Sequence, residues 1–145
     1  MTNDEEAGWA KINIRQSADE LLKYGPSIEV DIRAAINPGP SLKLLAQIDT
    51  GADITAISAR AAEALKLVPH GADGEIHEAG RGKIVVPYHF IRLTLPHGYI
   101  EMEVPRLPSL NPPHDVLIGR DLLRRGLLLV DFVAGMTTLH LKTGG

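Results

Sequence analysis

Apolar and polar residues alternate along much of the chain, which is typical of β-strands with one buried face. Two of the alternating runs lie on either side of Pro96-His97-Gly98, and the last two are joined near Ala134-Gly135. Runs separated by a short turn that contains glycine favour antiparallel hairpins. The strands predicted in this way are residues 28–33, 42–49, 91–95, 100–104, 128–132 and 137–141.

Helical signals are brief. Ser17-Ala18-Asp19-Glu20 has the form of a capping box, and Gly25-Pro26 ends the segment after about two turns. The 14 glycines and 10 prolines favour turns over long helices. Two shorter helices are expected at residues 59–66, where Ser58 is the N-cap, and at residues 122–125, before Gly126.

The composition narrows the class of protein. A chain of 145 residues has room for one compact domain, and 44% hydrophobic against 23% charged residues is ordinary for a globular fold. The absence of cysteine excludes disulfide frameworks, zinc–thiolate sites and cysteine nucleophiles. The pattern as a whole predicts a small, mainly β domain with a barrel-like or folded sheet.

Charge and hydropathy argue against two classes of partner. The net charge of −3 does not favour a nucleic-acid binder that uses a large basic surface. No apolar run approaches the roughly 20 residues of a membrane helix, so no membrane partner is expected. Residues 1–10 carry three acidic residues and no apolar core, unlike a signal peptide. We therefore expect a cytoplasmic protein.

The most informative segment is the apolar run that ends in Asp49-Thr50-Gly51. It places a carboxylate at the end of a strand, in a tight turn that Gly51 permits and that the Thr50 hydroxyl can stabilise. Taken alone, this tripeptide is a weak signal, because aspartate followed by glycine is common in ordinary turns. A second apolar strand, residues 115–119, also ends in glycine and is followed by a short helix.

Together, the two strand–turn segments resemble the retropepsin-like (retroviral-type) aspartic proteases. The markers are Asp49-Thr50-Gly51-Ala52-Asp53 and, later in the chain, Ile118-Gly119-Arg120-Asp121-Leu122. The resemblance covers roughly residues 28–141. It divides the chain into an N-terminal extension with a short helix, residues 1–26, and a retropepsin-like domain, residues 27–145.

The resemblance implies a closed or folded β-barrel-like half of an acid protease, with short helices after the Asp-Thr-Gly strand and after Gly-Arg-Asp. It implies that Asp49 is catalytic and that Thr50, Gly51 and Ala52 form the active-site turn. Two carboxylates about 3 Å apart share one proton, and the pair activates a water molecule without a metal or cofactor. Because the chain has a single Asp-Thr-Gly, the resemblance implies a homodimer that hydrolyses polypeptides.

The resemblance also implies roles for the second segment. Arg120 is expected to pair with Asp53, because a guanidinium can hold a carboxylate with two hydrogen bonds. Asp121 is not assigned to the catalytic pair. It is expected to cap the short helix that follows it.

Residues 77–85 match the flap, a glycine-rich hairpin that in this family closes over the bound peptide. Gly80 and Gly82, on either side of Arg81, suit the mobile tip of a hairpin. Arg81 departs from the apolar tips of the viral enzymes. An ordinary β-turn with a solvated basic tip explains the same residues equally well.

Other kinds of site lack support. His77-Glu78 is not followed by the second histidine of a helical zinc motif, and the six histidines show no ligand spacing. Gly80-Arg81-Gly82-Lys83 is not a phosphate-binding loop, and Ser58 has no nucleophile-elbow setting. The alternative to an aspartic endopeptidase is a non-catalytic module of the same fold that binds peptides or dimerises.

Overall fold

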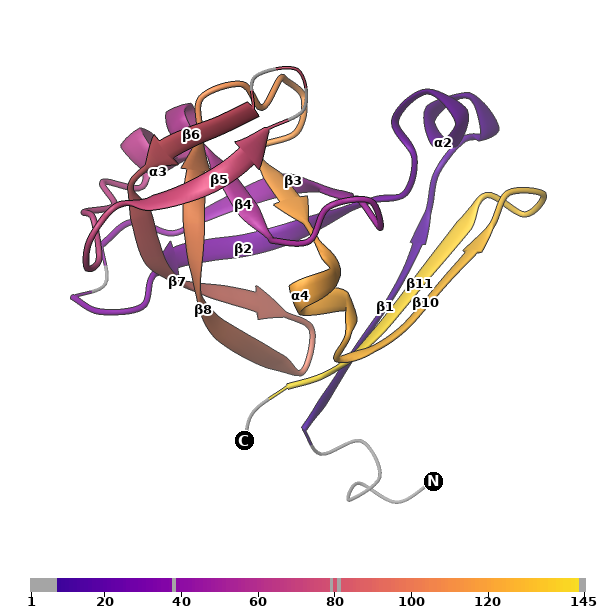
Figure 1. The fold of residues 1–145 in the computed structure, drawn as a ribbon. Coiled ribbons are helices and arrows are strands. Elements are labelled where there is room, and N and C mark those ends of the chain that lie inside the picture. Colours follow the sequence, from indigo (N-terminus) through magenta and orange to yellow (C-terminus); the bar gives the residue numbers. More distant parts are fainter. Residues whose placement is uncertain (1–7, 38, 79, 81, 144–145) are drawn as a thin grey trace.

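The computed structural model describes residues 8–143 except residues 38, 79 and 81, and it is mainly β, as predicted (Figure 1). Six strands close into a barrel in the order β2-β3-β9-β4-β8-β7. Neighbours are antiparallel except for the pairs β3–β9 and β4–β8, which are parallel. The barrel strands are β2 (Ser27–Ala34), β3 (Leu42–Ile48), β4 (Ala56–Ser58), β7 (Tyr88–Leu95), β8 (Gly98–Leu107) and β9 (Val116–Ile118).

The alternating pattern places apolar side chains inside the barrel. Ile28, Val30 and Ile32 of β2 are at most 2% exposed, whereas Glu29 between the first two faces solvent. Burying each such side chain contributes about 1.5–3 kcal/mol, so this alternation fixes which face of the strand points inward. The predicted hairpin around residues 96–98 is confirmed as the antiparallel pair β7–β8.

Two smaller sheets accompany the barrel. The hairpin of β5 (Gly74–Glu78) and β6 (Gly82–Val86) forms a two-stranded sheet beside it. The other sheet has three strands, the first and the last two of the chain. In it β11 (Met136–Lys142) lies between β1 (Trp9–Arg15) and β10 (Gly126–Asp131). The predicted pair of C-terminal strands is therefore confirmed.

Strand β1 was not predicted from the sequence. It lies within residues 1–26 and pairs with β11 along its whole length, from Trp9 opposite Lys142 to Arg15 opposite Met136. Its Ala10 and Ile12 are at most 8% exposed and pack into the same hydrophobic core as the barrel. The N-terminal segment is thus joined to the C-terminal strand by backbone hydrogen bonds.

The helices are short, and two have the predicted caps. In α2 (Ala18–Tyr24) the Ser17 hydroxyl accepts a hydrogen bond from the Glu20 amide at 3.1 Å, and Gly25 ends the helix with φ +72°. In α3 (Ala59–Ala64) the hydroxyl of Ser58 accepts from the amide of Ala61 at 3.1 Å. No helix in the described part of the chain is long and apolar enough to span a membrane.

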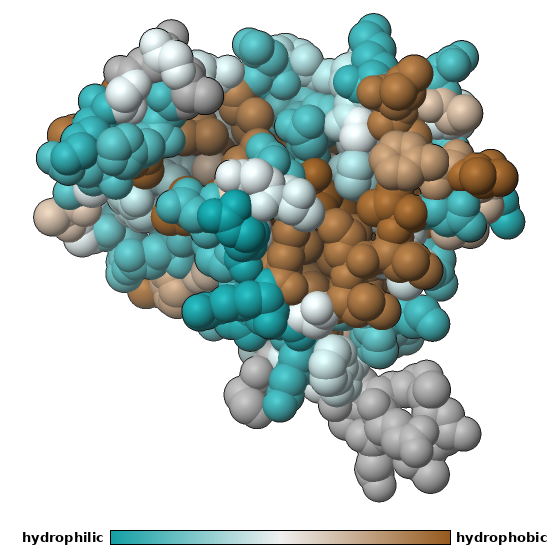
Figure 2. All heavy atoms as spheres, turned by 45° about the vertical axis from the view of Figure 1, so that its right-hand side comes forward, coloured by the Kyte–Doolittle hydropathy of each residue, from teal (hydrophilic) through white to brown (hydrophobic). Residues whose placement is uncertain are grey.

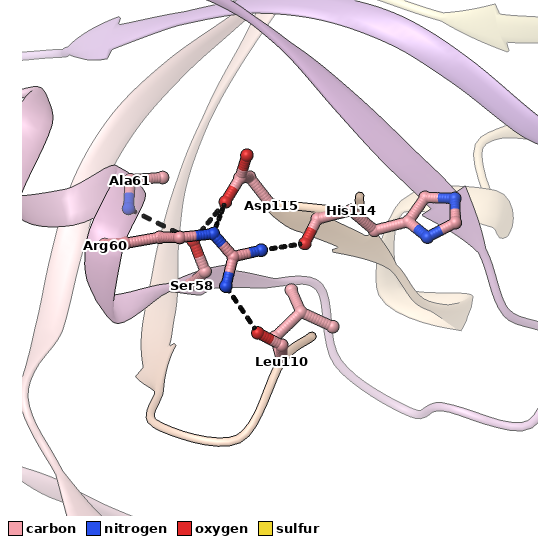
Figure 3. A network of polar contacts seen from close by, with 6 residues as sticks. All are labelled: Ser58, Arg60, Ala61, Leu110, His114 and Asp115. Carbon is pink, nitrogen blue, oxygen red and sulfur yellow. Dashed lines mark hydrogen bonds and ion pairs between the residues drawn. The ribbon is translucent and has the colours of Figure 1, made fainter. Parts of the chain in front are cut away.

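A polar network ties α3 to the strand β9 (Figure 3). The Arg60 guanidinium contacts an oxygen of Asp115 at 2.6 Å and donates to the carbonyls of Leu110 and His114 at 2.9 and 2.6 Å. Ser58 donates its hydroxyl to the same carboxylate oxygen at 2.8 Å. Because Asp115 directly precedes β9, this network fixes where that strand enters the barrel.

We expect Asp115→Ala to lower the free energy of unfolding by about 2 kcal/mol, because it removes charge-assisted bonds from Ser58 and Arg60 in a half-buried setting. Asp31→Ala is the matched control, since its one ion pair among the described residues, with Lys43, is exposed and 4.0 Å long. Its effect should stay below about 1 kcal/mol. Urea unfolding of both variants measures the difference, and equal losses would contradict a structural role for the network.

Two buried histidines resist protonation. His114 is 4% exposed, and its Nε2 lies 2.9 Å from the Ser27 hydroxyl. Burial lowers its pKa from the ordinary value, although the charge of Asp115 opposes the shift. His89 is fully buried between the carbonyl of Val68 and the guanidinium of Arg106. Its pKa is also lowered, chiefly by burial.

The lowered pKa values predict acid sensitivity. The unfolded chain takes up protons on these two histidines as the pH falls through about 6.5, while the folded protein does not. The contribution of each histidine to the free energy of unfolding is therefore fully present above that pH. Below it, the free energy of unfolding decreases by at most about 1.4 kcal/mol per pH unit for each group. His114→Gln should be less stable at pH 7.5 but lose less stability between pH 7.5 and 5.5. His97→Asn, in an exposed turn, should follow the wild type.

Candidate active site

The turn after β3 holds the carboxylate of Asp49 in a defined position. The amide of Gly51 donates to Asp49 Oδ1 at 2.8 Å, and the amide of Ala52 donates to the Asp49 carbonyl at 3.2 Å. A side-chain oxygen that bonds the amide two residues later closes a tight turn by itself. The sequence Asp-Thr-Gly thus orients its own carboxylate, which is partly exposed on this chain.

The end of β9 lies directly against this turn. The Asp49 amide donates to the carbonyl of Ile118 at 2.9 Å, and the Arg120 amide donates to the carbonyl of Ala52 at 2.9 Å. A Cβ atom on Gly119 would lie 2.6 Å from the backbone of Ile54, so only glycine fits there. The two strand–turn segments identified from the sequence are therefore brought together, with backbone hydrogen bonds on both sides of Gly119.

The predicted pairing of Arg120 with Asp53 is wrong in this structure. Both residues are exposed, and the ion pairs among the described residues do not include them. Instead, Arg120 Nη1 donates to the Thr50 carbonyl at 2.8 Å. A backbone carbonyl takes one hydrogen bond from the guanidinium, whereas the expected carboxylate would have taken two. Arg120 therefore holds the Thr50–Gly51 peptide, whose N–H donates to Asp49 Oδ1.

The predicted capping role of Asp121 is also wrong. Helix α4 (Arg120–Leu123) begins two residues earlier than expected, its N-cap is Gly119, and Asp121 lies inside it. One oxygen of Asp121 accepts from the Thr55 amide at 2.9 Å and from the Thr55 hydroxyl at 2.6 Å. The same hydroxyl accepts from the Gly119 amide at 3.1 Å. Asp121 is therefore occupied in joining the two segments.

Thr55 is a site residue that the sequence reasoning missed. Its side chain is fully buried, and it links the Gly119 amide to the Asp121 carboxylate. A buried hydroxyl needs partners of this kind, because leaving it unpaired costs roughly 1–3 kcal/mol. The available signal was a lone threonine at the start of the apolar run Ala56-Ile57.

The β5–β6 hairpin occupies the region expected to be the flap. Its strands pair from Gly74 opposite Val86 to Glu78 opposite Gly82, and Gly80 and Gly82 both have positive φ angles. Arg81, which was expected at the tip, lies outside the described residues. The structure thus shows a hairpin here, which both interpretations of the sequence require.

Tyr88 lies near the base of this hairpin. Its ring packs on Gly74, where an added Cβ would come within 2.6 Å of the ring. Burial raises the pKa of the Tyr88 hydroxyl, and the negative charges of Asp53 and Glu103 raise it further. The hydroxyl therefore remains a hydrogen-bond donor, in the electrostatic field of the exposed Asp53 carboxylate.

The chain has a single Asp-Thr-Gly turn, which holds Asp49. Asp49 is partly exposed, and Asp121 is bound to Thr55. A cavity of 480 Å³ lies elsewhere, lined by Tyr24, Ser27 and His114 among others and not by Asp49. Among the described residues, no group of three or more histidines or carboxylates is placed to hold a metal ion.

Comparisons with known proteins agree with this geometry. Among solved structures, a retropepsin-like aspartic protease from Rickettsia conorii superposes with a TM-score of 0.56 at 15% identity, covering 94% of each chain. EIAV protease in complex with an inhibitor superposes with a TM-score of 0.50 at 24% identity, covering 72% of this chain and 92% of its own. At these identities the likeness concerns the fold alone. A search of curated proteins finds no match.

The sequence pattern that defines the family described as "Retroviral aspartyl protease" matches residues 22–129. The match includes Asp49-Thr50-Gly51, the hairpin expected to be the flap and the segment from Ile118 to Leu122. These segments form the two strand ends and the hairpin described above. The chain belongs to the retroviral aspartyl protease family.

Proposed function

We propose that this protein is an aspartic endopeptidase whose active site forms between two identical chains, with one Asp49 from each. The observation that carries the proposal is the turn in which the Gly51 amide fixes a partly exposed carboxylate at the surface of the chain. A buried pair of like carboxylates is costly to a protein that only binds peptides. A catalytic role gives the pair a reason to exist.

The proposed mechanism is direct attack of water on the peptide bond. Two carboxylates brought within about 3 Å hold one proton between them. The ionised Asp49 takes a proton from a bound water while the protonated Asp49 of the second chain donates a hydrogen bond to the scissile carbonyl. The water oxygen adds to the carbonyl carbon. The leaving amine then accepts a proton from one of the two carboxyl groups as the C–N bond breaks, and the carboxyl pair returns to its starting charge.

The surrounding residues support this chemistry by positioning. Arg120 fixes the Thr50 carbonyl, so the Thr50–Gly51 peptide, whose N–H donates to Asp49, cannot rotate freely. The β5–β6 hairpin, which includes Gly80 and Gly82, would act as the flap that covers the polypeptide substrate. Asp53 is an exposed carboxylate beside the site and would meet the substrate backbone. Neither a metal nor a cofactor takes part in the proposal, and a cytoplasmic location remains a prediction.

We expect Asp49→Asn to reduce peptide hydrolysis by about a hundred- to ten-thousandfold, because the pair loses its ionisable groups while the size of the side chain is kept. Asp31→Asn, which alters an exposed carboxylate on β2, should retain full activity. The measurement is kcat/KM on a peptide library, with circular dichroism to check folding. If the wild-type protein is a folded dimer but hydrolyses no peptide, the result would favour the non-catalytic binding module.

Mixing the wild type with the Asp49→Asn variant tests whether the active site is shared between two chains. If each site needs Asp49 from both chains, mixed dimers are inactive, and activity falls as the square of the wild-type fraction. A site contained in one chain would give a proportional fall. Dilution of the wild type below its dimer dissociation constant should also reduce specific activity.

Arg120→Ala should reduce kcat/KM by roughly ten- to a hundredfold, because it frees the Thr50–Gly51 peptide that orients the Asp49 carboxylate. The free energy of unfolding should change by less than about 1 kcal/mol, since the lost bond is single and exposed. Arg120→Lys should recover most of the activity, because an ammonium group can also donate to one carbonyl. Unfolding and kinetics are measured on the same samples. A large loss of stability with unchanged kinetics would assign Arg120 a purely structural role.

A further inference from the structure

The β5–β6 hairpin has an inner and an outer face. Gly74, Ile76 and Glu78 of β5 point to the same side, because side chains alternate along a strand. An added Cβ on Gly74 would touch the ring of Tyr88, the first residue of the barrel strand β7, and Ile76 is only 7% exposed. This side therefore faces the barrel and is the inner face, whereas the exposed His77 lies on the outer face.

Glu78 is the one charged residue on this inner face. The neighbours that β6 places on the same face are Ile84 and Val86, which are apolar. Both carboxylate oxygens of Glu78 are buried, and neither has a hydrogen-bond partner among the described residues. No other charged side chain in the described part of the chain has this property. The residue opposite, Gly82, has no side chain that could supply a partner.

A buried carboxylate without a partner is unfavourable for the chain that carries it. Removal of a charge from water has a high free-energy cost unless hydrogen bonds or an opposite charge replace the water. Native proteins pair nearly all of their buried polar atoms, and the exceptions are expected at functional sites. The described basic residues of the hairpin, His77 and Lys83, face each other on its outer side. A partner from outside the chain would complete the bonding of Glu78.

An exposed hydrophobic area elsewhere in the molecule does not supply this partner. Leu127 and Leu129 of β10 are 57% and 58% exposed, and Phe132 and Val133 in the following turn are 59% and 101% exposed. Figure 2, which brings this side of the molecule forward, shows hydrophobic side chains gathered into one area. The area belongs to a different sheet from Glu78, and hydrocarbon side chains have no group that bonds a carboxylate.

Further negative charge lies near the base of the hairpin. Burial raises the pKa of the Tyr88 hydroxyl, and the charges of Asp53 and Glu103 raise it further. Because Tyr88 packs on Gly74, these two carboxylates act on the same side of the hairpin as Glu78. A surface with one sign of charge attracts a ligand of the opposite sign. The charges therefore favour a cation as the missing partner.

We propose that Glu78 selects polypeptide substrates that carry lysine or arginine close to the bond that is cut, by accepting hydrogen bonds from that basic side chain. The inference rests on the proposed function, which places the substrate beneath the β5–β6 hairpin. An ammonium or guanidinium group supplies both the donors and the charge that the carboxylate lacks in the free protein. Glu78 is thus a specificity-determining residue, and the chemistry remains with Asp49.

Matched peptides measure this preference. The peptides have the same sequence except for lysine, glutamine or glutamate at one position, which is moved along the residues on both sides of the scissile bond. At one position we expect the wild type to cleave the lysine peptide with a kcat/KM roughly ten- to a hundredfold higher than that of the glutamine peptide, because charge-assisted hydrogen bonds are the stronger ones.

Variants of Glu78 assign the preference to its charge. Glu78→Gln should reduce the ratio of the two kcat/KM values to about one, and Glu78→Lys should reverse the preference toward the glutamate peptide. Glu75→Gln, on the outer face of the same strand, is the matched control and should keep the wild-type ratio. Circular dichroism checks that each variant folds. An unchanged ratio in Glu78→Gln, or an equal loss of activity on every peptide, would overturn the proposal.

The free protein provides a second readout. Because the Glu78 carboxylate has no partner in the described structure, Glu78→Gln should unfold in urea at the same or a higher concentration than the wild type. A structural role for Glu78, for example in a bond to the hairpin of a second chain, would instead make the variant less stable. Such a loss of stability would overturn the proposal.

Binding separates this inference from the proposed function. Fluorescently labelled lysine and glutamine peptides are titrated into Asp49→Asn and into the double variant that also carries Glu78→Gln. Tighter binding of the lysine peptide that requires Glu78, together with a wild type that hydrolyses no peptide, would overturn the function and leave the selection standing. Hydrolysis by the wild type without any preference for a basic residue would overturn the selection and leave the function standing.

Discussion

The close approach of two strand ends is the constraint on which the candidate site depends. Gly119 lies so near the backbone of Ile54 that no side chain fits, and hydrogen bonds on both sides of it join the segments. Thr55 and Asp121 complete the junction with buried hydrogen bonds. Because the Asp49 amide is bonded to β9, any loosening of this junction moves the carboxylate. The position of Asp49 is a tertiary property, although its turn is local.

The junction also explains why the second segment contains polar residues that do no chemistry in the proposed mechanism. Arg120 and Asp121 are neighbours in the sequence, yet they bond different partners. Arg120 bonds a carbonyl at the surface, and Asp121 bonds a buried threonine. Buried polar groups need such partners, since desolvation without a hydrogen bond is costly. Arg120 and Asp121 lie beside Asp49 because they support the turn that holds it.

The described part of the N-terminal segment, residues 8–26, is joined to the rest of the fold by backbone hydrogen bonds. Strand β1 pairs with β11, and the carbonyl of Pro26 accepts from the amide of Ile48, the residue before Asp49. The segment thus contacts both the terminal sheet and the base of the candidate site. Because the terminal strands pair within one chain, β10 is left as the apolar edge of the sheet.

The sequence by itself determined the elements whose causes are local. The alternation of residues 28–33 and 42–49 fixed β2 and β3, because burial selects one face of a strand. Ser17 and Ser58 fixed the starts of two helices through bonds within one turn. The same holds for Asp49-Thr50-Gly51, whose turn is closed by its own side chain. The second strand–turn segment was recognised with it through the family resemblance.

Only the tertiary structure decided which partners distant residues would find. Arg120 was expected to pair with Asp53 but donates to the Thr50 carbonyl. Asp121 was expected to cap a helix but accepts from the Thr55 hydroxyl. Strand β1 alternates like any other strand, but its pairing with β11 joins opposite ends of the chain. A side chain's type limits the bonds that it can make, whereas the choice among chemically similar partners depends on backbone positions set by packing. That packing involves the whole barrel, so no local pattern encodes it.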